Sequence, residues 1–269
     1  MIAWELIDTF IRPDVLARAR ADVQSCVEEG LNTPLHLNFT KLFSKPLLLS
    51  IYAEELRLRN GVIIQRVPVV DGFSINGFNF PKDRMIVASS WHEQRDREVW
   101  NQGGGNGGEV HDVEDFWADR FVVYPDDPFS GPRKPGKDVK VKVAGVEDGE
   151  KKEPRYNIDS VAGSFIPYGG GKSLFFFDPQ HMHNHIEPSL YIHLINLAVY
   201  PLTLYTGAKV CPGRFYAKQE AVTGLALFIT KFDVEFLGDK KFKPNTSFFP
   251  FGVVPPLGDF RVKIRRRKV

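Results

Sequence analysis

The spacing of apolar residues changes near Asn60, and this change restricts what the chain can fold into. Before that point, apolar residues recur with the period of an amphipathic helix in three segments. Pro13 separates the first two segments, and Ser44 with Pro46 supplies the residue types of an N-cap and first turn for the third. The three predicted helices are "IAWELIDTFI", "DVLARARADVQSCVEEG" and "SKPLLLSIYAEELRLRN".

After Asn60 the period becomes two, which is typical of short strands. The residue types that a tight hairpin turn requires are present at Asn76 and Gly77. We therefore predict a mainly α fold with small antiparallel β-sheets. The strand-like segments are "VIIQRVPVV", "GFSINGF" and "RMIVASS".

Two later segments complete this prediction. Residues 101–157 are rich in glycine, proline and charge, so we expect a long loop with little regular structure. Residues 212–232 return to helical spacing. The predicted buried side of this last helix consists of Ala217, Val222, Leu225, Phe228 and Ile229.

Charge and cysteine content exclude some classes of function. The net charge of +2 gives no general basis for nucleic-acid binding, because such binding requires a concentrated basic surface. We interpret the basic tail "RVKIRRRKV" as a solvated strand end, with a surface for an acidic partner or anionic lipid as the alternative. The two cysteines, Cys26 and Cys211, imply no disulfide framework and favour a reducing compartment.

Two features have the residue types of a functional site. Glu54 and Arg57 are three residues apart on a predicted helix and share a face, and Arg120 in "FWADRF" is a candidate to join them from a loop. Cys211 directly precedes "PGR" and a predicted helix, where unpaired backbone N–H groups favour a thiolate and so a metal ligand. A surface ion pair and a small buried cysteine are the plain alternatives.

The order of these motifs resembles the motif order of the cytochrome P450 superfamily. "EELR", "FWADRF", "FIPYGGG" and "CPGR" follow one another as in the second half of a P450. The resemblance covers nearly all of residues 1–171 and 208–269. It implies that Glu54, Arg57 and Arg120 form the structural Glu-Arg-Arg triad of the family, and that Cys211 is the axial ligand of haem iron.

The haem-binding loop of the family reads aromatic, then Gly-x-Gly-x-Arg-x-Cys-x-Gly, and here it is obtained only by joining "FIPYGGG" to "AKVCPGRFYA". By resemblance, Lys209 replaces the usual Arg at a haem propionate, and Arg66 occupies the other propionate-binding position. The remaining cofactor-binding positions of the loop are Tyr168, Gly169, Gly171, Gly213 and Ala217.

The resemblance also implies a reaction, a cofactor and partners. We expect a haem-thiolate monooxygenase that inserts one oxygen atom from O2 into a lipophilic organic substrate. Its cofactor is haem b, and NADPH supplies electrons through NADPH-cytochrome P450 reductase. The complete enzyme is expected at the cytosolic face of the endoplasmic reticulum membrane.

Residues 172–207 interrupt the loop, and removing them restores it. We interpret this segment as a non-native insertion, an in-frame retained intron or a gene-model error. Two functional alternatives stay open. His181, His183 and His185 alternate as metal ligands on a strand would, and residues 188–207 are uncharged and long enough to consider as a membrane span.

The chain resembles a partial P450 haem domain over residues 1–269, from the end of the central helix to the C-terminus. The acid-alcohol pair of the distal side and the usual membrane anchor have no counterpart in it, so no catalytic residue is assigned beyond the haem ligand. A non-catalytic P450-derived fragment that does not bind haem productively is the alternative function.

Overall fold

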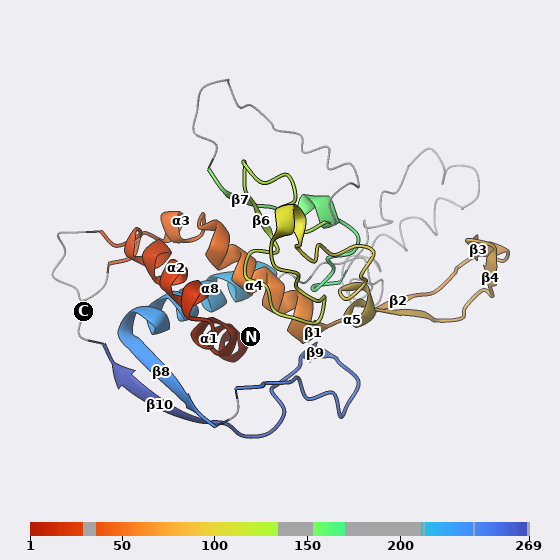
Figure 1. The fold of residues 1–269 in the computed structure, drawn as a ribbon. Helices are drawn as coiled ribbons and strands as arrows, with labels where there is room; N and C mark the ends of the chain where they lie inside the picture. Colours follow the sequence, from red (N-terminus) through yellow and green to blue (C-terminus); the bar gives the residue numbers. More distant parts are fainter. Residues whose placement is uncertain (29–35, 134–152, 170–210, 212, 239, 268–269) are drawn as a thin grey trace, which may run out of the picture.

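The computed structural model describes residues 1–28, 36–133, 153–169, 211, 213–238 and 240–267 (Figure 1). Helices form its centre, and short paired strands lie around them. The α-helices are α1 (Ile2–Phe10), α2 (Pro13–Gln24), α3 (Phe39–Leu42), α4 (Pro46–Arg59), α5 (Ser90–Glu93) and α8 (Arg214–Lys231), and 3-10 turns occur at Gly105–Gly107 and Asp159–Val161.

Helix α4 is the central element of the core. It contacts α1, α2 and α8, and each of its residues from Leu47 to Arg59 is buried. Because it is enclosed on all sides, its polar side chains must find partners within the protein. The polar residues of α4 therefore decide which loops and helices pack around it.

Proline sets the start of two helices. Pro13 and Pro46 each stand in the first turn, where a fixed φ is favourable and no N–H is needed. The prediction that Ser44 caps α4 is wrong. The N-cap is Lys45, and the Ser44 hydroxyl instead donates to the carbonyl of Lys41 at 2.8 Å, which closes the end of α3.

All strand pairs are antiparallel and two-stranded within the described residues, as the period-two segments predicted. The pairs are β1 (Asn60–Gly61) with β9 (Gly252–Val253), β2 (Ile63–Arg66) with β5 (Ile86–Ser89), β3 (Phe73–Ile75) with β4 (Phe78–Phe80), β6 (Val122–Val123) with β7 (Arg155–Tyr156), and β8 (Phe232–Leu237) with β10 (Arg261–Arg266). Asn76 and Gly77 turn the β3–β4 hairpin with φ of 48° and 82°. This hairpin projects from the helical centre (Figure 1).

Helix α8 differs from its predicted burial at its start. Val222, Leu225 and Ile229 are buried, and Phe228 packs edge-on against Phe10 of α1 with ring centroids 6.0 Å apart. Ala217, however, is exposed. The prediction for Ala217 is wrong because the first two turns of α8 extend beyond the core, and the first buried residue of the helix is Ala221.

Most of the described part of segment 101–157 is irregular, as predicted. A second apolar cluster holds it: Trp100 and Phe121 pack edge-on at 5.7 Å and both are fully buried. Ala53 of α4 belongs to the same cluster. The loop is therefore ordered by its contact with α4. In the portion of the chain with described coordinates, no helix has both the length and the apolar character needed to cross a bilayer.

Candidate functional site

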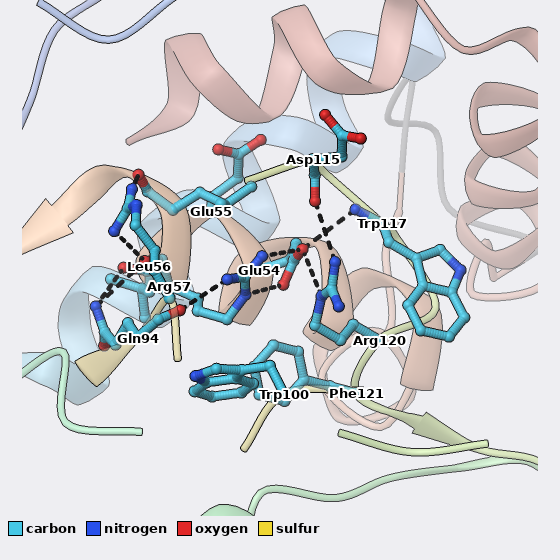
Figure 2. Close-up of polar contacts among 12 residues, drawn as sticks. Glu54, Glu55, Leu56, Arg57, Gln94, Trp100, Asp115, Trp117, Arg120 and Phe121 are labelled. Carbon is cyan, nitrogen blue, oxygen red and sulfur yellow. Dashed lines mark hydrogen bonds and ion pairs between the residues drawn. The ribbon is translucent and has the colours of Figure 1, made fainter. Parts of the chain in front are cut away.

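Glu54 lies at the middle of a buried ion-pair network on α4 (Figure 2). Arg57, one turn further along the same helix, donates from Nε to Glu54 Oε2 at 2.7 Å and from Nη2 to Oε1 at 2.8 Å. This is a two-bond fork between side chains with no exposed surface. The pair is thus a buried structural element and not a solvated surface pair.

Arg120 joins the network from the loop. Its Nε donates to Glu54 Oε1 at 2.9 Å, and the backbone N–H of Trp117 donates to the same oxygen at 3.2 Å. The rest of the Arg120 guanidinium binds loop carbonyls, including that of Asn101 and, at 3.1 Å each, those of Asp112 and Asp115. Arg120 therefore fixes the loop to itself and to α4 at once.

The network keeps its carboxylate charged. Burial by itself raises the pKa of Glu54, but the positive charges of Arg120 and Arg57 and their hydrogen bonds lower it to about 2. Burial lowers the pKa of Arg120 to about 10, against the attraction of Glu54. Both groups are ionised at neutral pH, and neither gains nor loses a proton there. The network therefore suits a structural role and not acid-base catalysis.

Sequence reasoning missed Gln94 and Arg95, which complete the network at the end of α4. The Gln94 side-chain amide donates to the carbonyls of Arg57 and Asn60 at 3.2 and 3.1 Å, and the backbone carbonyl of Gln94 accepts from Arg57 Nη1 at 2.7 Å. Arg95 donates to the carbonyl of Leu58. These bonds satisfy carbonyls that the helix end leaves open. No periodicity in "WHEQRDREVW" marks either residue.

Cys211 lies just before α8, and its backbone touches the other half of the split motif. Its N–H donates to the carbonyl of Tyr168 at 3.2 Å. The Cys211 carbonyl accepts from the N–H and the guanidinium Nη1 of Arg214 at 3.3 and 3.1 Å. Its side chain is exposed. The two parts of the motif are thus adjacent in space although residues 170–210 separate them in sequence.

Two glycines shape the backbone beside Cys211. Gly169 has a φ of 85°, a left-handed conformation that favours glycine. Gly213 is the N-cap of α8, and a Cβ at that position would lie 3.6 Å from the Cys211 sulfur. Ala217 donates its N–H to the carbonyl of Gly213 at 2.9 Å and lies one turn into the helix.

Pro167 and Tyr168 are both hydrogen-bonded to the α4 region. The hydroxyl of Tyr168 bonds that of Tyr52, a residue of α4 two positions before Glu54. Asn60, at the end of the helix, donates its side-chain amide to the Pro167 carbonyl at 2.5 Å. Burial, followed by the bond to Tyr168, raises the pKa of Tyr52, so its hydroxyl stays protonated. Helix α4 thus supports both the ion network and the Cys211 segment.

Comparison with known proteins gives the family. The chain is 32% identical to "Cytochrome P450 monooxygenase efuG" of Hormonema carpetanum over 99% of its residues, and 32% identical to "Cytochrome P450 monooxygenase fsoE" of Humicola fuscoatra over 99%. It is 23% identical to "Cytochrome P450 monooxygenase calL" of Penicillium decumbens, also over 99%. The chain belongs to the cytochrome P450 superfamily.

The matches cover much less of the relatives. The chain spans 40% of the efuG protein and 39% of the fsoE and calL proteins. No protein-family model matches it. These relatives are named monooxygenases, and membership of the superfamily implies haem as the cofactor.

The residues of this P450 chain around Cys211 fit an axial haem ligand. The Cys211 side chain is exposed just before the N-terminus of α8. Phe215 and Tyr216, on the first turn of α8, are 63% and 71% exposed, so apolar surface is available beside it. Among the described residues no group of three or more His, Cys, Asp and Glu side chains is arranged to hold a metal ion.

Several predicted residues of the P450 haem loop are outside the described structure. Gly171 and Lys209 are among them, as are residues 172–207 with His181, His183 and His185. Arg66 is described: it ends strand β2 opposite Ile86 and donates from Nη1 to the Gln65 carbonyl at 2.8 Å. Its role at a propionate stays a prediction.

Proposed function

We propose that this P450 chain is part of a haem-thiolate monooxygenase in which Cys211 is the axial ligand of haem b. The observation that carries the proposal is the hydrogen bond from the Cys211 N–H to the Tyr168 carbonyl, which brings the aromatic-glycine half of the loop to the cysteine. Haem bound through a thiolate supplies the chemistry that activates O2 for insertion of one oxygen atom into an organic substrate.

The chain's own residues would position the haem. Gly169 and Gly213 have no side chains, so the backbone at these positions would pass close to the porphyrin ring. The N-terminus of α8 would direct its backbone N–H groups toward the haem ligand. Lys209 and Arg66 would bind the propionates as point charge and guanidinium. Glu54, Arg57 and Arg120 would keep α4 and the loop rigid behind the site.

The proposal extends to substrate, partner and location. The substrate is a lipophilic small molecule, and electrons come from NADPH through NADPH-cytochrome P450 reductase. The complete enzyme would act at the cytosolic face of the endoplasmic reticulum membrane. Each of these rests on the resemblance to the superfamily.

Residues 172–207 are proposed to be an insertion that is absent from the functional loop. The contact between the segments on either side, at Tyr168 and Cys211, supports this. Sequencing of cDNA from the source tests it. A dominant transcript that lacks the segment is expected, and one that keeps it would contradict the proposal.

A second candidate is a P450-derived chain that does not hold haem productively. It is favoured by one observation, that residues 172–207 stand between the two halves of the haem-binding loop. One experiment separates the two functions: the reduced, CO-bound absorption spectrum of the chain expressed with haem supplied. A red-shifted thiolate-type band that is lost in Cys211→Ser and kept in Cys26→Ser supports the monooxygenase. Absence of the band in the unaltered chain supports the second candidate.

A further inference from the structure

A group of acidic side chains lies buried between α1 and α4, apart from the network around Glu54. Glu5 and Asp8 come from α1 and Glu55 comes from α4, two helices that contact each other. Glu5 and Glu55 have no exposed surface, and Asp8 is 3% exposed. Burial of an ionised carboxylate is costly unless positive charge or hydrogen-bond donors compensate it.

The nearby positive charges lie mainly beside Asp8. Arg12 Nη1 lies 2.5 Å from Asp8 Oδ1, and Arg59 Nη2 lies 3.2 Å from Asp8 Oδ2. Arg59 also reaches Glu55, with its Nε 3.5 Å from Oε2. In the described structure no ion pair involves Glu5. Two guanidinium groups therefore face three carboxyl groups.

Hydrogen bonding leaves the same two glutamates uncompensated. Both carboxyl oxygens of Glu5 and both of Glu55 are buried and have no hydrogen-bond partner within the described residues, and Thr9 Oγ1, one turn after Glu5, has none there either. An ionised carboxylate in such surroundings loses its hydration and gains no hydrogen bonds in exchange. The neutral acid is therefore the favoured form at both positions.

Burial has the largest influence on the pKa of both glutamates, and neighbouring charges act in both directions. Burial raises the pKa of Glu5 to about 8, although the N-terminal ammonium group lowers it. Burial and then the charge of Asp8 raise the pKa of Glu55, against the attraction of Arg59, and Glu5 raises it further. The charge of Glu5 also contributes to raising the pKa of the Tyr52 and Tyr168 hydroxyls. No charge on α2 or α8 is among the influences on Glu5 in the described structure.

We propose that Glu5 and Glu55 form a buried proton-binding site that holds α1 against α4 in its protonated state. In this state Glu55 is uncharged and adds no negative charge beside Asp8. Loss of the protons leaves more negative charge between the helices than Arg12 and Arg59 compensate. The contact between α1 and α4 then weakens. This proposal is independent of haem binding.

The direction of the pH dependence follows from proton binding. The folded protein binds protons at Glu5 and Glu55 more tightly than the unfolded chain does, so folding is favoured at low pH. The stabilisation decreases as the pH rises above the ordinary carboxyl value of 4.5, and for Glu5 it is lost at about 8. Stability should thus fall across the neutral range.

The first test is urea unfolding of the full chain from about pH 5 to about pH 9. The urea midpoint of the unaltered chain should decrease with pH, and Glu5→Gln and Glu55→Gln should each make that decrease shallower. The control Glu220→Gln removes an exposed carboxyl of α8 and should leave the slope unchanged. Equal slopes in the unaltered chain and in both buried variants would overturn the proposal.

A second measurement needs no variant to fold. Infrared spectra of the unaltered chain in D2O report the carbonyl stretch of a protonated carboxylic acid separately from carboxylate bands. At about pH 6.5, where exposed carboxyl groups are ionised, we expect this band to be present and to disappear as the pH rises. Its absence at about pH 6.5 would show that Glu5 and Glu55 are ionised, and this would overturn the proposal.

Discussion

Arg120 and Glu54 form a fully buried ion pair across 2.9 Å, although 66 residues separate them in sequence. The same Glu54 oxygen also accepts from Arg57 and from the Trp117 backbone. One carboxylate therefore fixes a helix, an arginine of the loop and the loop backbone. The contribution of Glu54 to the stability of the fold depends on all its partners being present, because an unpaired charge at this position has no access to water.

Glu54→Ala should strongly destabilise the fold. The substitution leaves Arg57 and Arg120 buried without their counter-ion, a change that typically costs about 3–5 kcal/mol. The measurement is the free energy of unfolding in urea. Glu235→Ala is the control, since Glu235 pairs with Arg265 at 3.5 Å and the two side chains are 60% and 64% exposed. The control should change stability by less than about 1 kcal/mol, and similar losses in both variants would contradict the account.

The same pair predicts a loss of stability in acid. The pKa of Glu54 is lowered from 4.5 to about 2 in the folded protein, so its contribution is complete above 4.5 and is lost as the pH falls toward 2. The shift corresponds to about 3 kcal/mol. Urea unfolding between about pH 2 and about pH 5 measures it, with Glu54→Gln as the comparison. An equal decrease with falling pH in that variant would assign the effect to other carboxyl groups.

Lysine should not be able to replace arginine at position 120. Lysine keeps the positive charge for Glu54 but cannot bind the carbonyls of Asn101, Asp112 and Asp115 with one planar group. We expect faster proteolysis within residues 101–119 in this variant, detected by limited digestion and mass spectrometry. Arg97→Lys alters an exposed arginine of the neighbouring segment and should leave the digestion pattern unchanged.

The Tyr52–Tyr168 bond predicts non-additive substitutions. Tyr52→Phe or Tyr168→Phe alone leaves one hydroxyl without its partner and should cost about 1 kcal/mol. The double variant should cost no more than either single one, because no hydroxyl then remains unpaired. A double-mutant cycle by urea unfolding measures this, with the exposed Tyr216→Phe as a neutral control. Strict additivity would show that the two hydroxyls do not interact.

Local sequence patterns predicted part of this site, and the packing of distant segments decided the rest. Glu54 and Arg57 share a helix face, so their proximity follows from a spacing of three residues. Gln94 and Arg95 serve the end of α4 only because strand β5 returns the chain there, and no local pattern contains that information. Ala217 has helical spacing but is exposed, since burial depends on where the core ends.

Cys211 is proposed to bind haem iron, and X-ray absorption at the iron edge detects the atoms bound to the iron. The haem-loaded protein lacking residues 172–207 should show a sulfur atom in the first coordination shell of the iron. The same protein with Cys211→Ser should show only nitrogen and oxygen, and with Cys26→Ser it should keep the sulfur. A haem-loaded protein with no sulfur neighbour, or with sulfur retained in Cys211→Ser, would contradict the account.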